Sequence, residues 1–188
     1  MSSRAQFLIL LAALAALGGT FYWMRNSAMS SGVNLPSASA VVAKLSPAQA
    51  NLPDAGYDWS LRALDGRIVP FSDFKGKTVF LNFWATWCGP CREEMPSIER
   101  MYQKVKDKGV EVAAVSWEEP DVVSRYVSNT NFTFPIYTFV RPAPHSYSSE
   151  GIPVTFIISP DGKIVRKHLD PDNWDQDSII QYLISLGR

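Results

Sequence analysis

From about residue 57 onward, hydrophobic and polar residues follow short, regular patterns that predict a mixed α/β domain. Residues 78–85 (TVFLNFWA) and 110–117 (VEVAAVSW) are apolar on both faces, which is typical of central buried strands. Between them, residues 88–108 carry apolar side chains at helical spacing, and Gly109 follows as a stop signal. We therefore expect a central β-sheet flanked by helices.

Weaker patterns complete this domain, which we place at residues 54–188. The Asp-Gly pairs at 65–66 and 161–162 each separate two short extended runs, and each pair predicts an antiparallel hairpin. The first hairpin would be an N-terminal extension of the domain. The remaining patterns predict a helix over 120–128, an extended segment over 134–139 and an amphipathic helix over 175–186.

The amino end has a different pattern, because residues 5–24 contain no charged residue. A helix of about 20 apolar residues can cross the roughly 30 Å core of a bilayer, and residues 21–23 (FYW) would lie at its far interface. Small residues at 13–19 (ALAALGG) also suit a signal-peptide cleavage site. We expect a transmembrane signal anchor over residues 1–25, with a cleaved, secreted form as the alternative. In both cases the rest of the chain is exported.

Residues 26–53 join this segment to the domain. They are rich in Ser, Ala, Pro and Asn and show no sustained period of a helix or a strand. Such a composition buries little apolar surface, so we interpret the segment as a flexible linker that holds the domain away from the membrane.

Charge and cysteine content exclude several classes of function. Lys plus Arg and Asp plus Glu both number 18, so no basic surplus indicates a nucleic-acid partner. The chain has only two cysteines, too few for the framework of bridges in a small secreted scaffold. Nothing in the composition indicates an oligomeric state.

The two cysteines, Cys88 and Cys91, lie where a buried strand gives way to a helix. A thiol at a helix start ionises more readily than a free thiol, and the thiolate is the species that attacks disulfides. With Gly89 and Pro90 between them, the two sulfurs can bond to each other. Pro90 restricts the first helical turn, and Gly89 leaves room for a partner chain. We expect Cys88 to be an exposed nucleophile and Cys91 a buried resolving thiol.

Two other interpretations of the pair are weaker. A zinc site needs about four ligands, and the only histidines, His145 and His168, lie on other segments. Two inert core cysteines remain an alternative, although Gly-Pro between them at a helix start is a poor choice for packing. We therefore predict a redox pair with no metal and no cofactor other than the Cys88–Cys91 disulfide.

Residues 82–96 (NFWATWCGPCREEMP) resemble the active-site segment of the TlpA/ResA-like, membrane-anchored thiol-disulfide oxidoreductases of the thioredoxin superfamily. The resemblance extends from about residue 57 to the end, and residues 151–164 (GIPVTFIISPDGKI) resemble the family's second signature. It implies a thioredoxin-like fold with a mixed sheet. It also implies that Pro153 is cis and lies beside the dithiol, where Ile152 presents its backbone to an extended client.

The resemblance also draws attention to neighbours of the dithiol. It implies that Trp87 shields one side of the dithiol, whereas Trp84 either adds docking surface or belongs to the core. Glu94 corresponds to a glutamate implicated in proton handling and in the thiol pKa; the alternative is a solvated helix charge, like the adjacent Glu93. Asn82 stands where cytoplasmic thioredoxins have an ionisable Asp, so a proton relay through that position is not expected.

One loop departs from the family pattern. The family usually supplies a helix between residues 135 and 151, but residues 141–150 (RPAPHSYSSE) contain two prolines and have weak helical character. This loop borders the expected cis-proline side, and we regard it as a candidate for tuning partner choice.

The resemblance implies a disulfide reductase outside the cytoplasm, held at the cell membrane, that acts on specific exported proteins, for example in cytochrome c maturation. Its partners would be disulfide-containing clients and a membrane thiol-disulfide electron donor. The first alternative is an oxidase or isomerase that runs the same exchange in the opposite direction. The second is a non-catalytic binding module.

Overall fold

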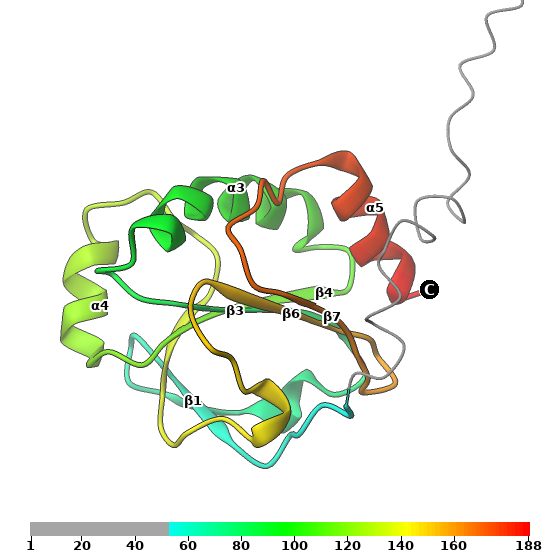
Figure 1. Ribbon diagram of the computed structural model, residues 1–188, viewed down its shortest axis with the longest axis horizontal. Helices are drawn as coiled ribbons and strands as arrows, with labels where there is room; N and C mark the ends of the chain where they lie inside the picture. The colour runs from blue at the N-terminus through cyan, green and yellow to red at the C-terminus, as the bar shows by residue number, and fades with distance from the viewer. Residues whose placement is uncertain (1–52) are drawn as a thin grey trace, which may run out of the picture. The chain divides into compact units, whose positions relative to one another are not determined.

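A mixed seven-stranded sheet forms the centre of the computed structural model, which describes residues 53–188 (Figure 1). The strand order is β2-β1-β5-β4-β3-β6-β7. In chain order the strands are β1 (Ser60–Ala63), β2 (Ile68–Pro70), β3 (Thr78–Trp84), β4 (Val110–Ser116), β5 (Ile136–Phe139), β6 (Val154–Ile158) and β7 (Ile164–His168). This sheet, flanked by helices, confirms the predicted α/β class.

The predicted membrane segment, residues 1–25, lies outside the described residues, as does the predicted linker up to residue 52. Both therefore stay predictions. Within residues 53–188, no helix has the length and apolarity needed to span a bilayer.

Strand β3 lies at the centre of the sheet, and all seven of its residues are buried. It pairs in parallel with β4, from Thr78 opposite Val110 onward, and antiparallel with β6, where Phe83 lies opposite Val154. A strand that is paired on both edges and covered on both faces needs apolar side chains at nearly every position. This requirement explains the continuous apolar run that predicted the strand.

The three α-helices contribute to a single hydrophobic cluster on one face of the sheet. They are α3 (Gly89–Val105), α4 (Pro120–Val127) and α5 (Asp177–Leu186), and Figure 1 shows α3 and α5 side by side over the sheet. Phe80 and Trp84 of β3 belong to this cluster, together with Ile98 of α3 and Leu183 of α5. The helical spacing of apolar residues in the sequence therefore reflects one shared core.

An aromatic cluster covers the opposite face of the sheet. The predicted N-terminal hairpin forms with Ser60 opposite Pro70, and its strand β1 adds to the sheet by antiparallel pairing with β5. The rings of Trp59 and Phe71 lie 4.4 Å apart between centroids, and those of Trp59 and Tyr147 lie 5.5 Å apart. Tyr147 comes from a short 3-10 turn, His145–Tyr147, inside the proline-containing loop. The loop thus contributes Tyr147 to the aromatic cluster on this face.

Both predicted Asp-Gly turns are present. Gly66 has φ 89° and Gly162 has φ 81°, in the left-handed region that side-chain-bearing residues avoid. These glycines allow the tight reversals between β1 and β2 and between β6 and β7.

We expect Leu81→Ala to lower the free energy of unfolding by about 2–5 kcal/mol, because Leu81 is fully buried and its truncation leaves a cavity. The matched control is Ile68→Ala on β2, where 49% of the residue is exposed and the loss should stay below about 1 kcal/mol. Urea denaturation of the oxidised full chain measures both. A similar loss for the two variants would contradict the assignment of β3 as the central strand.

Candidate active site

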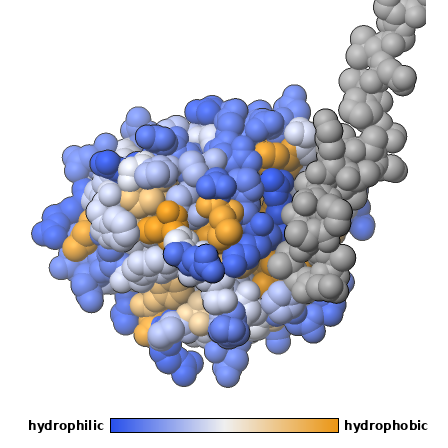
Figure 2. Space-filling view, in the orientation of Figure 1, coloured by the Kyte–Doolittle hydropathy of each residue, from blue (hydrophilic) through white to orange (hydrophobic). Residues whose placement is uncertain are grey.

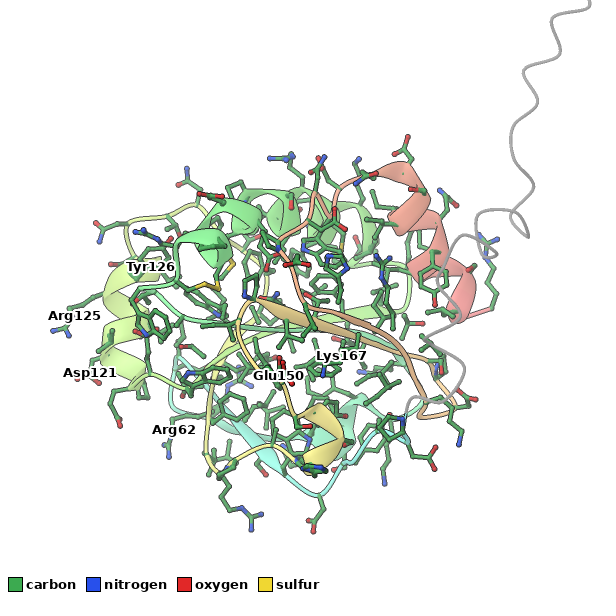
Figure 3. All side chains as sticks on the ribbon, viewed as in Figure 1. Arg62, Asp121, Arg125, Tyr126, Glu150 and Lys167 are labelled. Atoms are coloured by element: carbon green, nitrogen blue, oxygen red, sulfur yellow. A yellow bond between two sulfur atoms is a disulfide. The ribbon has the colours of Figure 1, made fainter. Side chains whose placement is uncertain are left out.

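The two cysteines lie at the junction of β3 and α3, as predicted. Cys88 is the N-cap residue of α3, with φ −79° and ψ 107°, and the backbone N–H of Cys91 donates to its Sγ atom over 3.2 Å. A disulfide joins the pair, with Cα atoms 5.3 Å apart, and appears in Figure 3 as a yellow bond near the start of α3. Because helix N-termini attract negative charge, this position favours a thiolate on Cys88 once the disulfide is reduced.

The residues between the cysteines suit a reactive position. Pro90 lies in the first turn of α3, where its missing N–H would have no partner in the helix anyway. A Cβ atom built on Gly89 would meet no atom within 4 Å, so the space beside the disulfide is open. The expectation that Gly89 leaves room for another chain is compatible with this geometry.

The expectation of an exposed Cys88 needs correction. Cys88 is only 5% exposed, although it is still more accessible than Cys91, which is 0% exposed. A nearby loop contributes to the cover, because the Cys88 Sγ atom lies 3.8 Å from the carbonyl oxygen of Ile152. Cys88 is therefore the more accessible cysteine of the pair, and Cys91 has no exposed surface.

This covering loop is the one identified from the second signature. The Ile152–Pro153 peptide bond is cis, as the resemblance implies, and Pro153 is buried beside a half-buried Ile152. The bond immediately precedes β6, the antiparallel neighbour of β3. The sheet itself thus brings residues that are distant in sequence up to the disulfide.

Three tryptophans near the pair differ sharply in exposure. Trp87 directly precedes Cys88 and is 68% exposed. Trp84 is fully buried, with its ring 5.7 Å from that of Tyr126, which Figure 3 labels on α4. Trp84 is therefore a core residue, and the docking alternative for it is wrong. Sequence reasoning missed Trp117, which follows β4 and is 50% exposed.

Glu94 is the buried carboxylate of the site, so its alternative as a solvated helix charge is wrong. It lies one turn after Cys91 on the buried face of α3 and is 3% exposed. Its Oε1 atom accepts a hydrogen bond from the Asn82 side-chain amide over 2.8 Å. Its Oε2 atom accepts from the indole N–H of Trp174 over 2.8 Å and from the backbone N–H of Asp172 over 3.3 Å.

The surroundings of Glu94 act on its pKa in opposite directions. Burial raises the pKa above the ordinary value of 4.5, and the hydrogen bonds from Trp174, Asn82 and Asp172 offset part of that rise. The net effect is a raised pKa, which makes Glu94 a carboxyl able to hold or release a proton inside the domain. Asn82 does not ionise, but it orients this carboxylate.

Trp174 was not identified from the sequence. It is fully buried, 80 residues from Glu94 along the chain, and precedes the C-terminal helix. Its backbone N–H donates to the Ser97 hydroxyl over 3.0 Å, so both its main chain and its indole are fixed against α3. No local pattern in the sequence pairs these positions, and only the folded chain reveals the contact.

A groove of about 460 Å³ lies at the ends of β3, β4 and β5. Phe83, Trp117 and Phe139 line one side, and the loop that includes Arg141 and His145 lines another. Apolar patches set among hydrophilic surface are also visible on the face shown in Figure 2. Six residues after His145, the same loop reaches Gly151, just before the cis bond.

Within the described part of the chain, no three or more His, Cys, Asp or Glu side chains gather closely enough to hold a metal ion. The cysteine pair can exchange two electrons with another disulfide by passing between its dithiol and disulfide forms.

Comparison with known proteins is consistent with this chemistry. The family model described as "AhpC/TSA family" matches residues 52–167. The chain is 38% identical over 115 residues to "Thiol-disulfide oxidoreductase ResA" of Bacillus cereus, covering 60% of this chain and 66% of the relative, just under two thirds of its length. It is 34% identical over 174 residues to the protein of the same name from Halalkalibacterium halodurans, covering 89% of each chain.

A solved structure gives a similar result for the fold. It is a thiol:disulfide interchange protein from Chlorobium tepidum TLS, described as a thioredoxin family protein. The match has a TM-score of 0.61 and 26% sequence identity, and covers 70% of this chain and 97% of that chain. The fold described above is therefore thioredoxin-like, as the resemblance implies.

We expect Glu94→Gln to remove a pH dependence from the stability of the domain. Because the pKa of Glu94 is raised above 4.5 in the folded state, the folded chain keeps this proton to higher pH than the unfolded chain. The residue's contribution to stability is therefore full below about 4.5, falls as the pH rises towards the raised pKa, and stays low above it. Glutamine cannot ionise, so this loss should disappear.

Urea denaturation between pH 4.5 and pH 8 measures this effect as the slope of unfolding free energy against pH. Glu93→Gln is the matched control, because Glu93 is an exposed neighbour on the same helix. If Glu94→Gln and Glu93→Gln change the slope equally, Glu94 does not keep its proton to higher pH in the folded state.

Proposed function

Because this chain belongs to the AhpC/TSA family and is ResA-like within it, we propose that it is a thiol-disulfide oxidoreductase that reduces disulfides in exported proteins. The observation that supports this most strongly is the geometry of the cysteine pair. A disulfide at a helix N-cap, with Cys88 more exposed than Cys91 and its sulfur 3.8 Å from the Ile152 carbonyl of another loop, suits exchange with another protein better than a structural role.

In the proposed reaction, the Cys88 thiolate attacks one sulfur of a client disulfide. The Cys88–client disulfide forms, the client's second sulfur leaves as a thiolate and that sulfur takes up a proton. Cys91 then loses its proton and attacks Cys88 Sγ, which restores the Cys88–Cys91 disulfide and releases the client's other thiol. Two electrons pass from the dithiol to the client, so a reductant must act before the next cycle.

The other site residues have roles in binding and proton transfer. Trp87 and the backbone of Ile152 flank Cys88, and we assign them to docking an extended client segment; Pro153 holds the Ile152 carbonyl in place. Glu94 lies one turn beyond Cys91 on the same buried helical face, and we assign it to accepting the proton that Cys91 must lose.

We further propose that the domain works outside the cytoplasm. Residues 1–25 would anchor it to the cell membrane and residues 26–53 would form the linker, with a membrane thiol-disulfide carrier as the electron donor. The clients would be specific envelope proteins, for example those that mature into cytochromes c.

We expect Cys91→Ser to trap clients as stable mixed disulfides, because Cys88 can still attack but no resolving thiol remains. Expressed as the full chain, this variant should give bands on a non-reducing gel that disappear on reduction, with exported proteins identified by mass spectrometry. Cys88→Ser, which keeps one buried cysteine, is the matched control and should trap far less. Equal trapping by both variants, or none by either, would count against the proposed reaction.

A redox titration of the Cys88–Cys91 pair against glutathione separates reduction from the reverse reaction. A reductase should have a potential below that of the glutathione pool, whereas an oxidase or isomerase should have a higher one. A binding module would keep its cellular function when both cysteines are replaced by serine.

A further inference from the structure

Glu118 lies in the loop between β4 and α4 and hydrogen-bonds to the loop that carries the cysteines. Its Oε2 atom accepts from the backbone N–H of Thr86 over 2.6 Å, and its Oε1 atom accepts from the Thr86 hydroxyl over 2.8 Å. Both carboxylate oxygens therefore hold one residue, 32 positions away along the chain. We call this pair of bonds the Thr86–Glu118 clasp.

The clasp holds the segment that leads directly into the disulfide. Strand β3 ends at Trp84, and Thr86 lies between that end and Trp87. The backbone N–H of Cys88 donates to the carbonyl of Ala85 over 3.1 Å, so Thr86 and Trp87 form a tight turn. Fixing Thr86 thus restricts the orientations that Trp87 and Cys88, the next two residues, can adopt.

Glu118 is itself held in place by Ser116, at the end of the strand that precedes it. The Ser116 hydroxyl donates to Glu118 Oε2 over 3.1 Å and accepts from the Glu118 backbone N–H over 3.2 Å. Ser116 is the last residue of β4 and lies opposite Trp84, the last residue of β3. The clasp therefore joins the loops that follow the carboxyl ends of β3 and β4, which are parallel neighbours in the sheet.

The chemistry of the clasp favours a strong, specific interaction. Hydrogen bonds to a carboxylate are roughly twice as strong as neutral ones. Among residues 53–188, no Lys, Arg or His nitrogen lies within 4.0 Å of this carboxylate, so its partners here are the neutral donors of Thr86 and Ser116. Glu118 is also half-buried, which limits competition from water.

We propose that Glu118 is a positioning residue for disulfide exchange, which fixes the turn before Cys88 so that Trp87 and the Cys88 sulfur face a docked client. The inference rests on the proposed function, since it concerns how that reaction accepts a protein substrate. The adjacent Trp117 is 50% exposed and Trp87 is 68% exposed. The clasp therefore also sets the spacing between the loops that carry these two exposed aromatic residues.

The test compares two disulfide probes on the reduced full-length protein. One is an extended peptide with a single cysteine linked to glutathione, and the other is dithiodipyridine, a small disulfide with no peptide backbone to dock. Glu118→Gln leaves only one oxygen to accept from Thr86, and Thr86→Val removes the hydroxyl while keeping the side-chain shape. Each variant should lower the second-order rate constant with the peptide by about fivefold, and change the dithiodipyridine rate by less than about twofold.

The adjacent Glu119 provides a matched control. It is exposed and makes no side-chain cap to α4, so Glu119→Gln should leave both rates within about twofold of wild type. The combined Glu118→Gln/Thr86→Val variant should be no slower than the slower single variant, because both changes break the same clasp.

Three results would overturn the inference. The first is a peptide rate for Glu118→Gln that matches Glu119→Gln. The second is an equal fall in both probe rates together with a lower melting temperature, which would indicate a merely structural role. The third is a wild-type protein that reacts with dithiodipyridine but leaves the peptide disulfide intact. That result would refute the proposed function itself. It differs from the first two results because it is seen in the wild-type protein, without any variant.

Discussion

The burial of β3 between β4 and β6 is the constraint on which the candidate site depends. All seven residues of β3 are covered, and the strand is hydrogen-bonded along both edges. The position of its end is therefore fixed, and a short turn over residues 85–88 leads from it into α3. Cys88 is the N-cap of that helix. The Ile152–Pro153 bond, just before β6, and Glu118, just after β4, lie at the same end of these strands. A shift of β3 along its neighbours would therefore move Thr86 away from Glu118 and Cys88 away from Ile152.

The polar groups of the site are fixed by partners that the hydrophobic core supplies. Glu94 would be costly to bury alone, because a charged carboxylate loses its hydration inside a protein. Trp174 supplies one donor and Asn82 of β3 another, so the carboxylate is held without a counter-ion among its hydrogen-bond partners. Burial raises the pKa of Glu94 by more than these hydrogen bonds lower it, so the pKa stays above its ordinary value. The core thus supplies the donors that stabilise this group and, by burying it, raises its pKa.

Much of the fold could be predicted because its signals are local. The apolar run of β3, the helical spacing of α3 and the two Asp-Gly turns each lie within a few residues of the structure they specify. The resemblance added the cis bond at Pro153. The exposure of Trp84 could not be decided, because β3 is buried on both faces and its pattern has no polar side. The position of Cys88 at the start of a helix predicts an exposed thiol, and the resemblance places Ile152 beside the pair; how closely the Ile152 carbonyl covers the Cys88 sulfur is seen only in the folded chain.

The contacts that sequence reasoning missed share one form. In each, one partner lies on the continuous stretch from β3 through Cys88 to α3, and the other comes from a distant loop: Trp174 for Glu94, and Glu118 for Thr86. In the proposed reaction the cysteine motif provides the reacting atoms, whereas residues of the distant loops bind the Glu94 carboxylate and the turn before Cys88. Changes in those loops could therefore alter client choice or proton handling while the cysteine motif stays the same. For this reason the motif alone indicates the proposed reaction but not its specificity.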